Sequence, residues 1–247
     1  MSDKITITTL AERPELNQKL REFSGSWPKF MQQDPIGTAL MGRVPELFPE
    51  HVLLALEGDD LVAHGRSIPF VFPDEERAEL PAGGWNQALM WGVADHRNGR
   101  TPTVASALEI SITAAHLGRG LSHDMLAAMR QNVQAMGLKT LYAPVRPNGK
   151  QDARQPMTEY IRQVREDGLP VDPWLRVHVK AGAELVKVAQ TSMVMAGSLD
   201  EWREWTGLAF DRTGEVIVPK ALVPVRCDVE HDYAVYVEPN VWVRHEL

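Results

Sequence analysis

The sequence predicts an α/β protein in which helices flank a mixed central sheet. An apolar, β-branched run at 103–113 is followed by an amphipathic run at 122–136 and by a second β-rich run at 138–145. A strand, a helix and a strand of about this length form a right-handed unit with parallel strands. Alternating segments near both ends of the chain add antiparallel strands, so we expect a mixed sheet.

Length and composition favour one soluble core. The 247 residues are 44% hydrophobic, which is enough to bury one sizeable core. No apolar run approaches the roughly 20 residues that cross a bilayer, and Met1-Ser2-Asp3-Lys4 leads into Ile5 without a signal core. We therefore expect a cytoplasmic protein without a membrane partner. Cys227 is the single cysteine, which excludes an internal disulfide and predicts a core residue.

Charge and histidine spacing argue against two classes of function. The net charge is −7, with acidic and basic residues interspersed, whereas affinity for duplex nucleic acid depends on clustered lysine and arginine. The eight histidines are scattered, and no HExxH pair is present. We therefore expect neither a nucleic-acid partner nor a metal.

The N-terminal part is predicted to contain a strand, a helix and a hairpin. In order, these elements are a strand at 4–9, a helix at 14–23, an irregular connector at 27–35 and two strands at 51–56 and 61–72. Leu16, Leu20 and Phe23 recur at helical spacing. The turn Gly58-Asp59-Asp60 separates the two later strands and predicts a hairpin.

Residues 73–102 are predicted to be an insertion into the core. The stretch 73–84 is rich in turn residues, and a helix is expected at 85–94. Its tryptophans Trp85 and Trp91 either pack in the core or border a substrate site, and the sequence leaves both roles open.

The C-terminal part is predicted to begin with helices and end in strands. The expected elements are a helix at 157–165 within a loop, a helix at 174–181, an extended run at 185–196, a helix capped by Ser198 and Glu201, and two or three antiparallel strands at 216–243. Because no linker precedes Ser198, residues 198–247 are expected to be a β-rich extension packed on the core at 1–197, rather than a separate domain. A homodimer interface is a further role left open for this extension.

A glycine-rich turn connects the central strand to the amphipathic helix. It reads His116-Leu117-Gly118-Arg119-Gly120-Leu121-Ser122. Glycines let the backbone approach an anion, and the helix N-terminus adds positive potential, so the turn predicts a phosphate site. A Walker loop is excluded because no GxxxxGK is present, and a dinucleotide GxGxxG would need glycine at His123. A turn without a ligand is the alternative interpretation.

This turn resembles the pyrophosphate loop of the GCN5-related acyltransferases, whose pattern is Arg or Gln, two residues, Gly, one residue, then Gly or Ala. Gly120 holds the required glycine, while Leu117 and Ser122 depart from the pattern at its first and last positions. The order of elements from Ile5 to Ala196 is also similar to that of the family. A family motif with tyrosine four residues before glycine matches His178 and Gly182, so histidine replaces the tyrosine.

The resemblance implies an acetyl-CoA-dependent N-acyltransferase that acts on a small-molecule amine, with a protein or peptide amine as the variant left open. It implies a GCN5-type mixed sheet and no metal. Backbone groups of Ile110, Ser111 and Ile112 would bind the pantetheine arm, and Asn148 stands where the family often has a cofactor-binding asparagine. The implied pyrophosphate contacts are Leu117, Gly118, Arg119, Gly120, Leu121 and Ser122.

Two residues are predicted to carry the chemistry. Glu109 is the single carboxylate of the central strand, and apolar surroundings should raise its pKa, as a general base needs. A solvent-facing or paired glutamate is the alternative, and an ungapped alignment to the family puts the base nearer Ser106. His178 is predicted to act as the acid for the leaving thiolate, or as the base, because histidine titrates near neutrality. A structural histidine is the other interpretation.

A second class of function shares the same fold. A CoA-binding or regulatory module without catalysis would explain the departures at Leu117, Ser122 and His178. Consumption of a thioester in the presence of amines separates the two hypotheses, because a binding module would hold CoA without turnover.

Overall fold

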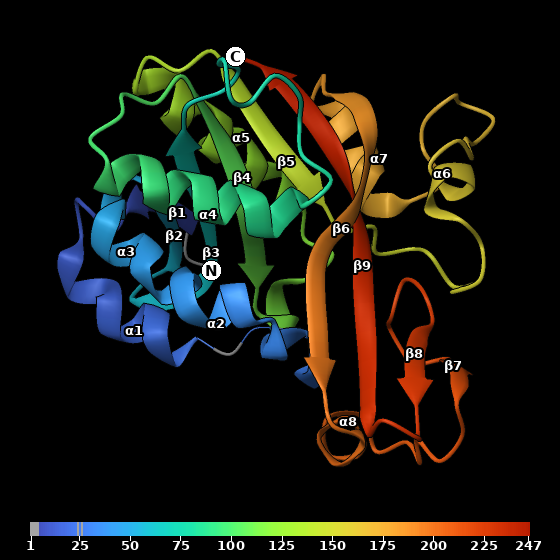
Figure 1. Cartoon of the computed structure of the whole chain (residues 1–247). Coiled ribbons are helices and arrows are strands. Elements are labelled where there is room, and N and C mark those ends of the chain that lie inside the picture. The colour runs from blue at the N-terminus through green and yellow to red at the C-terminus, as the bar shows by residue number, and fades with distance from the viewer. Residues whose placement is uncertain (1–4, 24, 26) are drawn as a thin grey trace.

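A computed structural model describes residues 5–23, 25 and 27–247, and its strands form one mixed sheet (Figure 1). The strands are β1 Ile5–Thr9, β2 Val52–Glu57, β3 Asp60–Phe70, β4 Val104–Ile112, β5 Thr140–Val145, β6 Glu184–Gly197, β7 Gly214–Val216, β8 Val225–Asp228 and β9 Tyr233–Glu246. Their order is β1-β2-β3-β4-β5-β9-β8-β7, and β6 also pairs with β9. The predicted α/β class is confirmed. The first residue of the predicted first strand, Lys4, lies outside the described residues.

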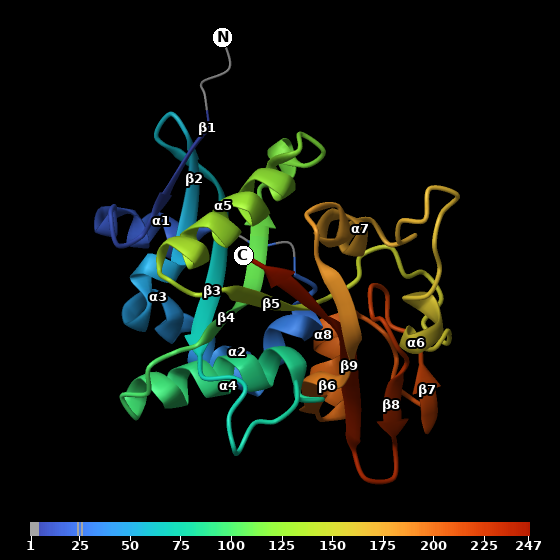
Figure 2. The same cartoon turned by 90° about the horizontal axis from the view of Figure 1, so that it is seen from above.

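Helices cover both faces of this sheet. The α-helices are α1 Asn17–Glu22, α2 Pro35–Leu40, α3 Val44–Leu47, α4 Gly84–Arg97, α5 Leu121–Ala135, α6 Met157–Tyr160, α7 Pro173–Lys180 and α8 Leu199–Thr206. Figure 2 shows α5 on one face and α4 with α2 on the other. Within the described part of the chain, none of the helices combines the length and apolar character needed to span a membrane. The cytoplasmic location and the homodimer stay predictions.

The hairpin strand β2 shows why two helical layers are needed. Its residues are buried on both faces: Leu54 packs in the cluster that contains Leu89 of α4, and Leu53 packs in the cluster that contains Met125 of α5. Successive side chains of a strand point to opposite faces, so an unbroken apolar run requires cover on both. The run Val52-Leu53-Leu54-Ala55-Leu56 meets this condition.

The parallel pairing of β4 and β5 is confirmed, but it is short. The two strands pair only at Ala105 with Leu141 and at Ser106 with Tyr142. Strand β5 instead pairs along its whole length with β9, antiparallel, from Thr140 with Glu246 to Val145 with Val241. Beyond Ser106, β4 therefore has no β5 neighbour, and the sheet opens between them.

The last strand, β9, lies inside the sheet. It pairs with β5, with β6 and with β8, so the tail 198–247 supplies an interior strand of the sheet that β1–β5 begin. The expected helix cap at its start is present, because Ser198 and Glu201 form a reciprocal capping box. Whether residues 198–247 behave as an extension without independent stability stays a prediction.

Two segments differ from the sequence predictions. The predicted connector at 27–35 contains the 3₁₀ helix Lys29–Gln33, and short helices continue to His51, beginning with α2. Asp34 caps α2 by accepting a hydrogen bond from Gly37 N at 2.6 Å, with Pro35 as its first residue, a signal the prediction missed. The helix predicted at 157–165 ends at Tyr160, and the chain then forms a tight reversal in which Arg165 N donates to Leu169 O and Val171 N donates to Gln163 O.

Candidate active site

Two adjoining cavities lie along β4 where it separates from β5. The first is lined by residues 107–111 of β4, residues 143–145 of β5, and side chains from the N-terminal and C-terminal parts of the chain. The second lies between the glycine-rich turn and α7. Both cavities are lined by Ile110, Ser111, Asn148 and Trp174, so together they form one groove.

The structure brings most of the predicted cofactor residues to the second cavity. Those that line it are Ile110, Ser111, Ile112, Leu117, Gly118, Gly120, Leu121, Ser122 and Asn148. Arg119 is the exception, since its guanidinium Nη2 lies 3.3 Å from Glu57 Oε1, away from the lining. Their role in cofactor binding stays a prediction.

The glycine-rich turn adopts a backbone that favours glycine. Gly118 and Gly120 have φ values of +76° and +85°, a region that residues with a Cβ rarely occupy. Helix α5 begins at Leu121 with Gly120 as its N-cap, slightly earlier than the predicted start at Ser122. The backbone N–H groups of Leu121 and Ser122 donate to no described residue. Both residues line the second cavity, and unpaired N–H groups at a helix N-terminus are what an anion site requires.

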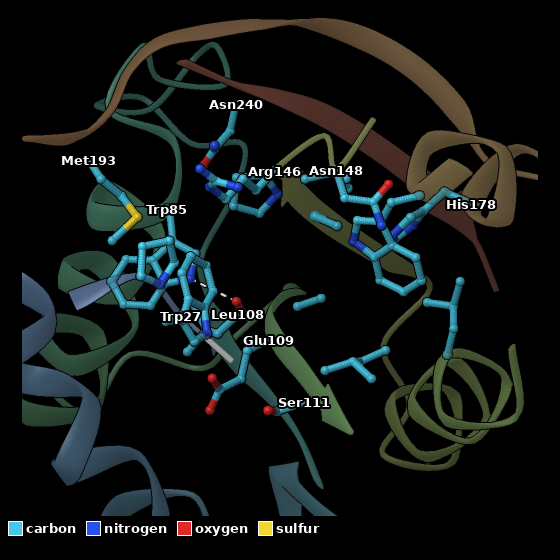
Figure 3. A pocket seen from close by; sticks show the side chains of 18 residues that line it. Trp27, Trp85, Leu108, Glu109, Ser111, Arg146, Asn148, His178, Met193 and Asn240 are labelled. Carbon is cyan, nitrogen blue, oxygen red and sulfur yellow. Dashed lines mark hydrogen bonds between the residues drawn. The ribbon is translucent and has the colours of Figure 1, made fainter. Parts of the chain in front are cut away.

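A β-bulge directs Glu109 into the first cavity. Ala107 pairs with Ser67 and Glu109 pairs with Arg66, so Leu108 is the extra residue on β4. Bulges re-aim side chains and interrupt pairing. The carbonyl of Leu108 is satisfied by Trp85, whose Nε1–H donates to it at 2.7 Å (Figure 3).

Glu109 is mostly buried, with 13% of its side chain exposed, and it is paired. Its Oε1 lies 3.3 Å from Arg66 Nε and 3.5 Å from His64 Nδ1, and Trp27 lines the same cavity. Burial raises the pKa of Glu109, while the Arg66 charge and the Trp27 side chain oppose that rise. The pKa of Glu109 is therefore shifted in the predicted direction. Glu109 also forms an ion pair with Arg66, as the alternative interpretation expected. Ser106 is fully buried, and its hydroxyl donates to Ala107 O rather than lining either cavity.

Helix α7 carries His178 to the wall of the first cavity. Asp172 caps this helix: its Oδ1 accepts from Trp174 N and Leu175 N, and its Oδ2 accepts from Gly149 N at 2.7 Å. One carboxylate thus fixes the helix to the loop that carries Asn148.

His178 is held in a neutral state. Its Nδ1 lies 2.9 Å from His245 Nε2, and Trp174 packs edge-on against its ring at 4.7 Å. Burial, followed by the effect of His245, lowers the pKa of His178 to about 3. This differs from the expectation of titration near neutrality, because an imidazole removed from water resists protonation.

Sequence reasoning missed several residues of the first cavity. These are Trp27, Arg146, Met193 and Asn240. Trp85 also lines this cavity, in agreement with the role at the border of a site that the sequence left open for it. Trp91 instead packs against Phe70 and Phe72 in the core. The missed residues come from a predicted connector, a loop and the two longest strands, where no local pattern marks a site. Figure 3 shows Trp27 and Trp85 on one side of the cavity and His178 with Asn148 on the other.

The groove thus combines free helix N–H groups, a carboxylate with a raised pKa and a neutral imidazole. Such a set can bind a phosphorylated cofactor, accept a proton and stabilise developing negative charge. Within residues 5–23, 25 and 27–247, no group of three or more histidine, cysteine, aspartate or glutamate side chains could hold a metal ion.

Comparison with known proteins identifies a relative that matches almost the whole chain. The arginine N-acetyltransferase avaD of Aspergillus versicolor is 31% identical over 275 residues, which cover 98% of this chain and 94% of the relative. No protein-family model matches the chain.

Solved structures resemble the whole chain. The loading GNATL domain of CurA from Lyngbya majuscula superposes with a TM-score of 0.63 at 18% identity, covering 99% of this chain and 98% of that domain. The GphF GNAT-like decarboxylase in complex with isobutyryl-CoA superposes with a TM-score of 0.56 at 14% identity, covering 98% of both chains. At these identities the likeness shows the fold.

The buried histidines predict a loss of stability in mild acid. Burial lowers the pKa of His51 and of His245 to about 4, and those of His64 and His178 to about 3, from 6.5. Below pH 6.5 these histidines become protonated in the unfolded chain but stay neutral in the folded chain. The free energy of unfolding should therefore fall as the pH drops from 6.5 toward 4. Each histidine contributes a slope of about 1.4 kcal/mol per pH unit.

Urea unfolding at closely spaced pH values measures this slope. His51 lies outside both cavities of the groove, where its Nδ1 lies 2.9 Å from Ser67 Oγ. The variant His51→Gln should therefore show a slope shallower by about one proton. Parallel slopes in the variant and the parent would contradict the assignment of a depressed pKa to this residue.

Proposed function

This chain belongs to the GCN5-related N-acetyltransferase family, and on that premise we propose that it transfers an acetyl group from acetyl-CoA to a nitrogen of arginine, or of a small molecule that contains an arginine side chain. The broader activity needs no proposal: the chain is an acyl-CoA-dependent N-acyltransferase of small-molecule amines. The hypothesis of a module without catalysis is accordingly set aside.

One observation carries the proposal. Strands β4 and β5 pair at two positions and then separate, and the groove in the opening runs from the glycine-rich turn to Glu109. A thioester that lies in this groove would have its pyrophosphate at the N-terminus of α5 and its acyl carbon between the two strands. Backbone groups of β4 that face the opening are available to orient the pantetheine arm and the thioester carbonyl.

The first cavity supports a cationic, planar acceptor. Glu109 supplies a carboxylate, and Trp27 and Trp85 supply aromatic rings on the same side. A guanidinium group pairs with carboxylates and stacks on aromatic faces. The similar protein of Aspergillus versicolor bears the name of an arginine N-acetyltransferase, which agrees with this chemistry.

Glu109 is the proposed general base. The acceptor nitrogen is protonated in water and must lose a proton before its lone pair can attack the thioester carbon. A carboxylate whose pKa is raised by burial holds that proton better than an exposed one. Attack forms the carbon–nitrogen bond, and the carbon–sulfur bond then breaks. Of the two protons that the nitrogen loses, one ends on the CoA sulfur and the other is released to solvent.

The acceptor class is tested by thioester consumption with matched compounds. We expect the purified protein to consume acetyl-CoA faster with arginine than with citrulline, which has nearly the same shape but lacks the charge that pairs with Glu109. Release of free CoA thiol, followed with a thiol reagent, measures the rate, and mass spectrometry identifies the acetylated product. Equal rates with the two compounds would rule out charge recognition at this cavity.

The glycine-rich turn predicts a loss of cofactor binding in Gly120→Val. A β-branched residue is strained at the φ of +85°, so the turn should move away from its anion-binding form. We expect calorimetry to detect no binding of acetyl-CoA. Gly99→Val is the matched control, because Gly99 also has a positive φ, +66°, no atom lies within 4 Å of the place that a Cβ would take, and it lines neither cavity of the groove. Normal affinity in a folded Gly120→Val protein would remove the support for this site.

The proposed base predicts that Glu109→Gln lowers kcat by about 10²- to 10⁴-fold, because the amide cannot accept the proton. The affinity for acetyl-CoA should not change. Glu204→Gln is the control, since Glu204 forms a surface ion pair with Lys29 at 2.9 Å. Initial rates over a range of acceptor concentrations separate kcat from KM. A fall of less than a few-fold would assign Glu109 to structure alone.

A further inference from the structure

His178 and His245 form a buried pair at the wall of the first cavity. His178 lies on α7 and His245 near the end of β9, and the two residues are 2% and 0% exposed. The 2.9 Å distance from His178 Nδ1 to His245 Nε2 is that of a hydrogen bond. His178 lines the cavity, whereas His245 lies behind it.

Only one proton can occupy this hydrogen bond, so two arrangements exist. In the first, His178 Nδ1–H donates to His245, and His178 Nε2 then carries a lone pair. In the second, His245 Nε2–H donates to His178, and His178 then carries its proton on Nε2. A neutral imidazole has one N–H donor and one acceptor, so the two arrangements give His178 opposite chemistry.

The surroundings of His245 Nδ1, the ring nitrogen that does not face His178, distinguish the two proton arrangements. His245 Nδ1 is buried and has no hydrogen-bond partner among the described residues. The first arrangement would place an N–H there, and the second would place a lone pair. A buried donor without a partner is rarer and more costly than a buried acceptor without one. The nearby Arg130 charge, which helps to lower the pKa of His245, also attracts a lone pair and repels an N–H.

We propose that His245 is a positioning residue, which donates its Nε2–H to His178 Nδ1 and thereby fixes His178 as an Nε2–H donor toward the acyl-transfer cavity. The role rests on the proposed function, because that function supplies the negative charge to be stabilised. Charge develops on the thioester oxygen and then on the sulfur as the acceptor attacks, and a fixed N–H near such charge lowers the barrier without giving up its proton.

This arrangement assigns His178 neither of the proton-transfer roles that its sequence position predicts. A neutral Nε2–H donor is not an imidazolium acid, and its lone pair is already occupied by His245, so it is not a base. An imidazole held in one tautomer by a hydrogen-bonded partner is a device that other enzymes use with a carboxylate partner. Here the partner is uncharged, so it orients the ring without raising the pKa of His178.

Nitrogen NMR tests the tautomer without any turnover. In protein labelled with ¹⁵N at histidine, protonated and unprotonated ring nitrogens resonate far apart, and the spectrum of His178→Gln assigns the His178 signals. We expect His178 to be protonated at Nε2 and His245 also at Nε2. Protonation of His178 at Nδ1 would overturn the proposal. Because this readout needs no acceptor, it stands even if the proposed acetyl transfer to arginine is wrong.

Two variants of similar size test the consequence for the rate. His245→Gln keeps an N–H donor for His178 Nδ1, and kcat should stay within about threefold of the parent. An ionised glutamate in His245→Glu can only accept, so it reverses the tautomer of a neutral His178, and because a carboxylate also raises the pKa of His178 the rates are compared at a pH where NMR shows His178 to be neutral. There kcat should fall by about 10- to 100-fold, the range that misplaced supporting residues cost elsewhere. The KM for acetyl-CoA should be unchanged in both. Equal kcat values in the two variants would overturn the proposal, and the NMR measurement decides it if either variant fails to fold.

Discussion

Backbone hydrogen bonding in the middle of the sheet is the constraint on which the site depends. Strand β5 pairs with β9 over all six of its residues and with β4 over only two. A strand that forms backbone hydrogen bonds with one neighbour can separate from the other. The backbone N–H and C=O groups that lose their partners must then find new ones or face a cavity. The carbonyl of Leu108 finds Trp85, and the groove occupies the rest of the opening. The bulge that releases this carbonyl also aims Glu109, so sheet geometry and chemistry share one cause.

A buried polar network supports the same cavity from behind. Glu238 is fully buried and accepts hydrogen bonds from Arg146 Nε, Tyr236 OH and Asn240 Nδ2. A buried carboxylate is tolerated only when it is fully paired in this way. Ser192 Oγ donates to Asn240 Oδ1 at 2.5 Å and accepts from Trp85 N at 2.8 Å. The network therefore joins β6 and β9 to the start of α4, and so it fixes the aromatic wall formed by Trp85.

Sequence patterns predicted the part of the site that consecutive elements of the chain form. The apolar strand, the turn around Gly120 and the amphipathic helix follow one another, so periodicity and glycine placement were sufficient for β4, α5 and β5. The direction of the Glu109 pKa shift also followed from its apolar neighbours. Trp27, Arg146 and Asn240 could not be found in this way, because their places depend on pairings between distant strands. The protonation of His178 depends on His245, which lies 67 residues further along the chain.

The position of β9 has a consequence for how the protein folds. This strand pairs with β5, β6 and β8, and β5 is separated from it by a long stretch of chain. Pairings between distant segments form slowly, because the loop between them must close first. Until β9 docks, one edge of β5 is unpaired, and such an edge invites pairing with other chains. Since His245 lies on β9, docking of this strand completes both the sheet and the wall of the first cavity.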